Sequence, residues 1–139
     1  MTTIEDIKRS LLLIAKDRLS SVEDKNFYPD PPTGKYSRPC FYLEFIDKKS
    51  AKSYFGSKLY DYAFNIILEN KEASDAVKIR NNEIEDLFVI NERISFYHFI
   101  DENIKYSREG HLTVKNFRIV EGGKERQKNR IRGELVITF

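Results

Sequence analysis

The residues best suited to recognise a partner form a basic run near the end of the chain. The segment GGKERQKNRIR holds one acid, Glu125, and five cations, which are Lys124, Arg126, Lys128, Arg130 and Arg132. A cluster of this density can bind phosphate groups or an acidic protein surface, or it can form a solvated loop between the last two strands. No aromatic residues lie between the cations, although single-stranded nucleic acid is bound largely by stacking on aromatic rings. The pattern therefore favours a solvated loop or a protein contact over direct contact with DNA.

A second basic group lies in the connector DKKSAKSYFGS, residues 47–57, which carries Lys48, Lys49 and Lys52. The connector joins two apolar runs and is too long for a tight turn. Either the flanking strands extend into it as a projecting hairpin, or it is a flexible arm. We expect these lysines and the cations of the basic run to lie at an interface with another protein.

The sequence contains no recognisable catalytic, cofactor-binding or metal-binding pattern. His98 alternates with apolar residues and His111 follows a Glu-Gly turn, so neither has the partner spacing of a zinc site or of a nucleophile and its base. The pair at 122–123 is Gly-Gly without the Lys-Ser or Lys-Thr of a phosphate loop, and it indicates a turn. The single cysteine, Cys40, cannot form an intramolecular disulfide and is expected in the core. We therefore expect no enzymatic activity, no cofactor and no metal.

Length and composition indicate one domain, residues 1–139, with a single hydrophobic core. The net charge is only +2, so the average charge indicates neither a nucleic acid nor a membrane partner. The longest apolar run, residues 11–15, is far shorter than the roughly 20 residues that a membrane span requires. The first residues also lack the basic start of a secretion signal. We expect a soluble protein that is not exported by a standard signal.

The clearest strands flank the lysine-bearing connector. In KLYDYAFNIIL, residues 58–68, the even positions from 60 to 68 are large and apolar, whereas the odd positions include Asp61 and Asn65. This period of two is typical of a strand with one buried face. In CFYLEFI, residues 40–46, the contrast is weaker and indicates cover on both faces, at least in part. The two runs predict a long hairpin at the centre of the sheet, with a core of Phe41, Leu43, Phe45, Tyr62, Phe64 and Ile66.

Three further strands are predicted at 94–100, 111–120 and 131–139. Within 111–120 the alternation changes phase. The apolar residues occupy even positions at Leu112 and Val114 and odd positions at Phe117 and Ile119. A β-bulge near residues 115–116 would bring both pairs to the same side.

Two helices complete the prediction. Residues 3–19 place Ile4, Ile7, Leu11 and Ile14 at helical spacing, with Lys8, Arg9, Lys16 and Asp17 on the opposite, solvated side. A second helix over about 75–90 follows a plausible N-cap at Ser74 and would turn Val77, Ile84, Leu87 and Phe88 inward. Its polar middle is expected to face solvent or another subunit.

The segment between the first helix and the hairpin, residues 20–39, holds all four prolines and must be a long connection. Its aromatic residues, Phe27, Tyr28 and Tyr36, either pack on a neighbouring element or form a short edge strand. Together these elements predict an α+β fold, with a mainly antiparallel sheet of about four to five strands packed with an N-terminal helix and a mid-chain helix.

This arrangement resembles the phage tail terminator family of Gram-positive phages and phage-tail-like particles. The segments that carry the resemblance are RPCFYLEF at 38–45, the aromatic strand at 59–68, SDAV at 74–77 and EGHLTVKNFRI at 109–119. They cover most of the chain and concern the fold rather than any chemistry. The sequence differs from the family pattern in its polar second helix and its glycine-containing basic loop.

The resemblance implies a structural virion protein that forms a homo-hexameric ring on the head-proximal end of the tail tube. Such a ring ends growth of the tube, and of the sheath in a contractile tail, and joins the tail to the neck. The implied partners are further copies of the chain, the tail tube protein, the sheath protein if the tail is contractile, and a neck or connector protein, with no membrane partner. Assembly would take place in the cytoplasm of the host bacterium, in a phage or in a tail-like bacteriocin. Two alternatives remain open: a head-tail neck or completion protein, and a small nucleic-acid-binding module that uses the 124–132 loop.

Overall fold

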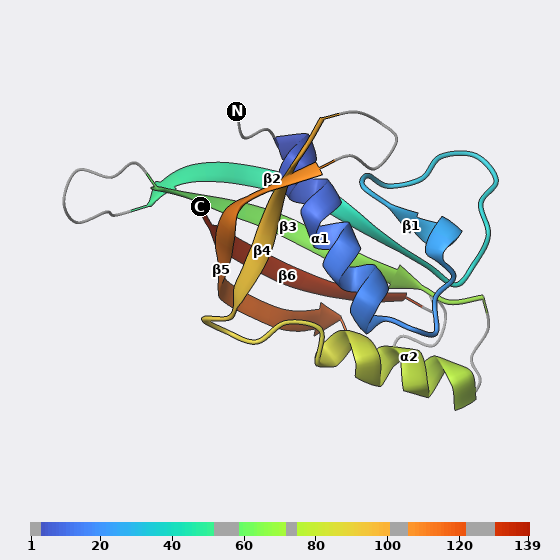
Figure 1. Cartoon of the computed structure of the whole chain (residues 1–139). Coiled ribbons are helices and arrows are strands. Elements are labelled where there is room, and N and C mark those ends of the chain that lie inside the picture. The colour runs from blue at the N-terminus through green and yellow to red at the C-terminus, as the bar shows by residue number, and fades with distance from the viewer. Residues whose placement is uncertain (1–3, 52–58, 72–74, 101–105, 122–129) are drawn as a thin grey trace.

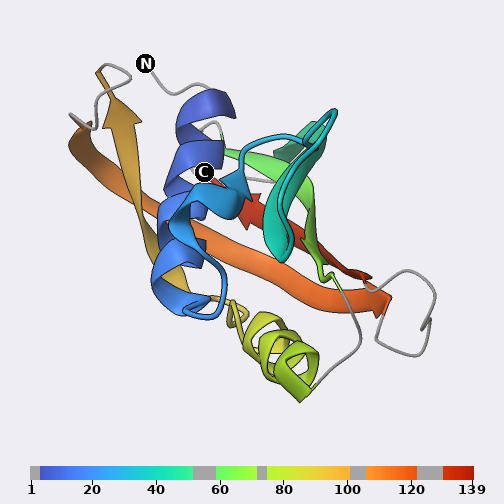
Figure 2. The same ribbon diagram turned by 90° about the vertical axis from the view of Figure 1, so that its right-hand side faces the viewer.

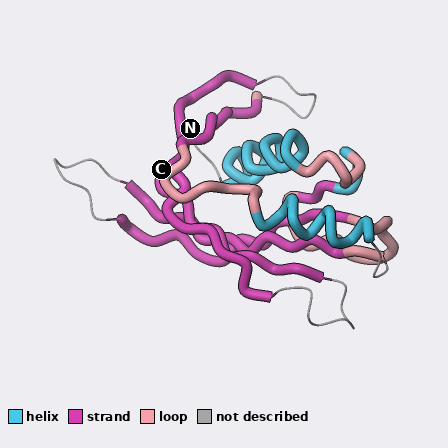
Figure 3. Tube along the Cα trace, turned by 90° about the horizontal axis from the view of Figure 1, so that it is seen from below, coloured by secondary structure: helices cyan, strands magenta, loops and turns pink. Residues whose placement is uncertain are grey.

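The computed structural model describes residues 4–51, 59–71, 75–100, 106–121 and 130–139. These residues form two helices, a short 3-10 helix and one six-stranded, curled sheet, with both helices on the same face of the sheet (Figure 1, Figure 3). The α+β fold with an N-terminal helix and a mid-chain helix is thus confirmed. In chain order the elements are α1 (Ile4–Arg18), η1 (Asp24–Asn26), β1 (Phe27–Tyr28), β2 (Cys40–Ala51), β3 (Leu59–Glu69), α2 (Asp75–Glu85), β4 (Arg93–Phe99), β5 (Tyr106–Glu121) and β6 (Arg130–Thr138).

The strand order is β1-β2-β3-β6-β5-β4, which differs from the prediction in two respects. The sixth strand is β1, which pairs parallel to the start of β2, so the aromatic pair at 27–28 forms the short edge strand that was one of two possibilities. The β2–β3 hairpin is not at the centre as a unit, because β6 inserts between β3 and β5. The two central strands are therefore β3 and β6, and β2 lies next to the edge.

The β2–β3 hairpin is long because both strands continue into the lysine-bearing connector. Cross-strand pairs run from Cys40 opposite Glu69 to Ala51 opposite Leu59. This extension confirms the projecting hairpin up to residues 51 and 59, and the tip of the connector lies outside the described residues. A register shift between Phe45 and Asp47 makes residue 46 a bulge.

The core lies between the helix-bearing face of the sheet and the two helices. Phe41, Leu43, Phe64 and Ile66 are at most 1% exposed, as the alternation predicts. Of the six predicted core residues, Tyr62 is also buried and Phe45 is partly buried against the core. On the other face of the sheet, the described residues cover one end, where Tyr28 and Tyr36 pack on a small cluster of Cys40, Tyr42 and Ile67.

Helix α1 supports the core as predicted, because Ile7, Leu11 and Ala15 are fully or almost fully buried. One residue of its predicted solvated side is not solvated: Lys8 is 7% exposed. Its Nζ lies 2.6 Å from Asp30 and 3.3 Å from Glu5. The proline-rich connection passes beside this side of the helix, and Asp30 supplies the charge that allows the lysine to be buried.

Helix α2 ends at Glu85, earlier than the predicted end near residue 90. The predicted inward residues Ile84, Leu87 and Phe88 are nevertheless buried. The chain turns after Ile84, whose carbonyl accepts a hydrogen bond from the Leu87 amide at 3.2 Å. Leu87 and Phe88 therefore reach the core from this turn rather than from the helix. None of the described helices is long and apolar enough to cross a membrane.

Strand β5 begins at residue 106, earlier than predicted, and it contains the expected bulge. The register shifts between Val114 and Asn116, which confirms the predicted position. Leu112 and Val114 are fully buried before the bulge, and Phe117 and Ile119 pack against the same core after it. The long β5 crosses the molecule beside β4 and β6 (Figure 2).

Candidate assembly surfaces

The lysines of the hairpin lie on the part of β2 that follows its bulge. Lys48 pairs across from Tyr62, and its Nζ lies 4.2 Å from the centre of the Tyr60 ring and 5.6 Å from that of Tyr62. Such cation–π contacts hold an exposed ammonium in place without neutralising it. Lys49 is exposed and lies 3.8 Å from Asp47, whereas Lys52 lies outside the described residues.

The described part of the 124–132 basic run is not a solvated loop. Arg130 and Arg132 belong to β6, opposite Glu69 and Ile67 of β3, and both are half-buried. The correction follows from pairing, because β6 has to begin at residue 130 to cover the full length of β3. Lys124, Arg126 and Lys128 lie outside the described residues, so their prediction stays untested.

The described members of the two predicted basic groups lie apart from one another. Lys48 lies opposite Tyr62 and Arg130 lies opposite Glu69, at positions seven residues apart along β3. At about 3.4 Å per residue, the strand positions of Lys48 and Arg130 are separated by roughly 24 Å. Basic side chains therefore lie toward both ends of the sheet.

A buried carboxylate, Glu69, organises the end of the sheet near Arg130. It accepts hydrogen bonds from the hydroxyls of Tyr42 at 2.7 Å and Tyr36 at 2.8 Å, and from Nε of Arg38 at 3.2 Å. Burial by itself raises the pKa of Glu69, but these three hydrogen bonds outweigh burial and hold the pKa below its usual value.

The same environment keeps neighbouring groups neutral. Burial, followed by the hydrogen bond to Glu69, raises the pKa of the Tyr42 hydroxyl well above its usual value. Burial, followed by the charge of Glu69, raises the pKa of the Cys40 thiol to about 11. Cys40 is fully buried, as predicted, and it is protonated at neutral pH. The cluster thus joins β2, β3 and the proline-rich connection.

Among the described residues, two ion pairs on the sheet face opposite the helices connect different strands. Lys115 of β5 lies 2.6 Å from Asp61 of β3, which also accepts a hydrogen bond from Thr138 at 2.7 Å. Arg118 pairs with Glu134 at 2.9 Å. Burial raises the pKa of Asp61, but the Lys115 and Thr138 hydrogen bonds outweigh it and lower the pKa.

A shallow apolar groove of about 430 Å³ interrupts this polar face. Its floor includes Ala63 and Val136 of the central strands, and the bulge residue Ile46 stands at its side with 52% of its surface exposed. Asp47, Lys49, Asp61 and Lys115 provide charges around it. An apolar floor with a charged rim is the usual anatomy of a protein contact.

The opposite edge of the sheet is formed by β4, and α1 covers half of it. Ser10 accepts a hydrogen bond from the Tyr97 amide at 3.1 Å, and its single hydroxyl hydrogen can reach the Asp6 carbonyl at 2.8 Å or the Tyr97 carbonyl at 3.3 Å. Asp6 accepts a hydrogen bond from the Phe99 amide at 3.1 Å and lies 2.8 Å from His98. Sequence reasoning missed Asp6 and Ser10, because their partners are about ninety residues away and give no local signal.

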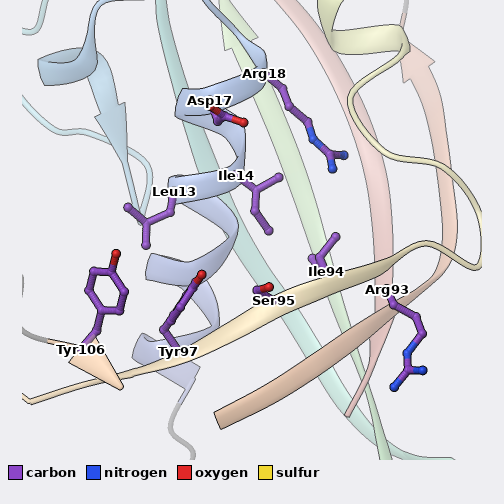
Figure 4. Close-up of a pocket in the computed structure, with 9 residues that line it drawn as sticks. All are labelled: Leu13, Ile14, Asp17, Arg18, Arg93, Ile94, Ser95, Tyr97 and Tyr106. Atoms are coloured by element: carbon purple, nitrogen blue, oxygen red, sulfur yellow. The ribbon is translucent and has the colours of Figure 1, made fainter. Parts of the chain in front are cut away.

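Beyond Ser10 the helix and β4 separate and leave an open cleft of about 530 Å³ (Figure 4). Leu13 and Ile14 of α1 face Ser95 and Tyr97 of β4 across it, and Tyr106 of β5 lies at one end. Tyr106 is 45% exposed and its ring centre lies 4.6 Å from that of Tyr97. Asp17, Arg18, Arg93 and Ile94 complete the lining.

Arg18 does not contribute a free charge to this cleft. Its guanidinium forms a two-pronged ion pair with Glu92 and donates to the Leu87 carbonyl at 2.7 Å. The hydrogen bond from Arg18 holds the pKa of Glu92 below its usual value. Asp17 and Arg93, by contrast, are exposed and form no ion pair within the described part of the chain.

The two histidines do not form a polar constellation with each other. His98 is half-buried beside Asp6, and exposed His111 has its Nε2 3.1 Å from a guanidinium nitrogen of Arg108. Among the residues that the structure describes, no group of three or more histidine, cysteine or acidic side chains could hold a metal ion.

Comparison with known proteins adds no family to this description. No protein-family model matches the sequence, and no characterised protein matches it significantly.

Proposed function

We propose that the protein is a tail terminator subunit, a structural component of a phage or of a phage-tail-like particle. It caps the head-proximal end of the tail tube as a homo-hexameric ring, ends growth of the tube, and of the sheath in a contractile tail, and provides the surface that joins the neck. The observation that carries the proposal is that the helices cover one face of the sheet and leave much of the other face to charged and apolar side chains. One face holds both helices (Figure 3). The other face holds charged pairs and an apolar groove, and described basic side chains lie toward both ends of the sheet.

Such a distribution suits a ring subunit. A closed ring of one chain is built from head-to-tail contacts, in which two different surfaces of the subunit meet. A terminator must in addition contact the tube on one side and the neck on the other. A domain with an uncovered sheet face, an open cleft at β4 and a projecting hairpin offers several unlike surfaces for these contacts.

The segments that resemble the family occupy the framework of the fold. RPCFYLEF leads into β2 and forms half of it, residues 59–68 are β3, and EGHLTVKNFRI lies within β5 with its bulge. These segments position the uncovered face, since β2, β3 and β5 contribute three of its strands. The partners are accordingly further copies of the chain, the tube protein, the sheath protein in a contractile tail, and the neck or connector. Assembly takes place in the cytoplasm of the host bacterium.

The test is deletion of the coding sequence in the bacterium that makes the particle, followed by electron microscopy of the tails. We expect tails of uncontrolled length, or tails that fail to join heads, with recovery when the gene is restored. Uniform tails of normal length, joined normally, would refute the proposal.

Purified components separate the terminator from its alternatives. Isolated tube ends should bind the protein, whereas binding only to the connector would identify a neck or completion protein. Retention on DNA at physiological salt, weakening steeply as salt rises, would identify a nucleic-acid-binding module instead.

A further inference from the structure

The two edges of the sheet differ in a way that allows one copy to dock on another. Beyond Tyr42, which pairs with β1, the outer edge of β2 has no strand beside it in the described part of the chain. At the opposite edge, Tyr97 and Phe99 direct their backbone groups toward α1. In an antiparallel strand, the backbone N–H and C=O groups of every second residue point to the same edge. The backbone groups of Arg93 and Ser95 therefore also point away from β5. Among the described residues, no helix side chain forms a hydrogen bond with the backbone of these two residues, and both line the open cleft.

The side chains near these edges are complementary. On β2, the exposed Ile46 is followed by Asp47 and Lys49, whose side chains are 49% and 77% exposed. In the cleft, Leu13, Ile14 and Tyr97 supply apolar surface, and the lining also includes an exposed base, Arg93, and an exposed acid, Asp17. An apolar side chain near an acid and a base thus has a counterpart in a cleft that combines apolar surface with a base and an acid.

We propose that the β2 edge around Ile46 of one copy docks into the α1–β4 cleft of the next copy. Ile46 enters the cleft, Asp47 meets Arg93 and Lys49 meets Asp17. This inference rests on the proposed ring function, which requires a head-to-tail contact between unlike surfaces. The second copy is the occupant because β2 and β4 lie on opposite sides of the sheet, so that each docked copy leaves a free edge for the next.

The affinity of one such contact is low, whereas a closed ring of these contacts is stable. Exposed ion pairs contribute little individually, and the Lys49–Asp47 pair within one copy is loose enough, at 3.8 Å, to be exchanged for new partners. Closing a ring makes the last contact intramolecular, which raises the overall affinity without any new type of contact.

Crosslinking tests the contact directly. Ile46→Cys and Ser95→Cys are made as separate variants, mixed, treated with a short bismaleimide in concentrated solution and on isolated tails, and analysed by denaturing gel. The native Cys40 is buried, so the unmodified chain serves as the blank. A mixture of Ile79→Cys with Ser95→Cys is the matched control, because Ile79 is an equally exposed apolar residue, at 59%, on the distant helix α2. We expect crosslinked dimers from the first mixture and none above the blank from the control.

Charge exchange provides a second test with exposed residues that do not support the core. Arg93→Asp alone and Asp47→Arg alone should each reduce the crosslink yield several-fold, because each places like charges opposite one another, and the combined variant should restore the yield. If the combined variant does not restore the crosslink, the proposed ion pair between Asp47 of one copy and Arg93 of the next is refuted.

The outcomes distinguish this inference from the proposed function. Capped tails without the 46–95 crosslink would overturn the docking contact and leave the terminator function standing. A strong crosslink in a protein that caps no tails would support the contact and refute the function. Crosslinking of Ile46→Cys to itself, without the Ser95 partner, would indicate a two-fold dimer and overturn the head-to-tail arrangement.

Discussion

Removing the charge of Glu69 should cost the fold about 2–3 kcal/mol, because the carboxylate is the shared acceptor of the cluster at the end of β3. Its side chain is 12% exposed and it accepts hydrogen bonds from two tyrosine hydroxyls, one of them the buried Tyr42. Hydrogen bonds to a charged group contribute roughly 1.5–3 kcal/mol each, against about 0.5–1.5 kcal/mol for neutral ones. Glu69→Gln preserves the shape, loses about 1 kcal/mol or more at each tyrosine, and turns an amide N–H₂ toward one of the donors. Arg38 adds little, because its side chain is 47% exposed.

The dependence on pH identifies the cause. The pKa of Glu69 is lowered in the folded protein from a usual value of 4.5, so its stabilisation is complete above that value and is lost as pH falls through the folded pKa. Glutamine does not titrate. The difference in unfolding free energy between the parent and Glu69→Gln should therefore be constant near neutral pH and should shrink in acid.

Urea unfolding, followed by circular dichroism at neutral pH and at several acidic values, measures both quantities. Glu134→Gln is the matched control, since it removes an acid from the same sheet face whose side chain is 41% exposed and paired only with exposed Arg118. The control should change stability by less than about 1 kcal/mol. A loss at Glu69 no larger than at Glu134, or a difference that persists unchanged in acid, would refute the reasoning.

Three further predictions concern the core, the sheet and the basic run. Phe64→Ala should destabilise the protein by about 3–5 kcal/mol in a urea melt, since the ring is 1% exposed; a change below about 1 kcal/mol would place this face outside the core. Gly133→Ala should cost roughly 1–3 kcal/mol, because a Cβ there would lie 3.1 Å from Ile66 and 3.2 Å from the Arg118 carbonyl; an unchanged melting temperature would mean that the sheet can adjust. Arg126→Glu with Lys128→Glu should leave the melting temperature unchanged and reduce tail capping or head joining, most at low salt, where charges are least screened; normal assembly by this variant would show that the run contacts only solvent.

The strands were predictable because their burial is a local pattern. Phe64 and Ile66 alternate with Asn65 in the sequence and in the sheet, and the phase change within 111–120 located the bulge of β5. The strand order was not predictable in the same way. β6 lies between β3 and β5 because its apolar face completes the core there, and that choice depends on packing between distant segments.

The candidate surfaces were predictable only in part for the same reason. The basic residues were visible in the sequence, but Arg130 and Arg132 belong to a strand, and their distance from Lys48 along β3 emerges only from the register. The α1–β4 cleft had no sequence signal, because its position depends on Asp6 and Ser10 capping one half of an edge strand that is formed some ninety residues later.

Two β-bulges place residues beside the groove on the sheet face opposite the helices. A β-bulge breaks the alternation of a strand, so the residue in it no longer has to follow the pattern of buried and exposed neighbours. The bulge of β2 at Ile46 and one bulge of β5, at Lys115, border the same groove, with Ala63 and Val136 of the central strands also in its lining. An isoleucine that is more than half exposed at such a position does not contribute to the core of its own chain. If the β2 edge docks as proposed, the contact covers an apolar side chain that folding of the chain itself leaves 52% exposed.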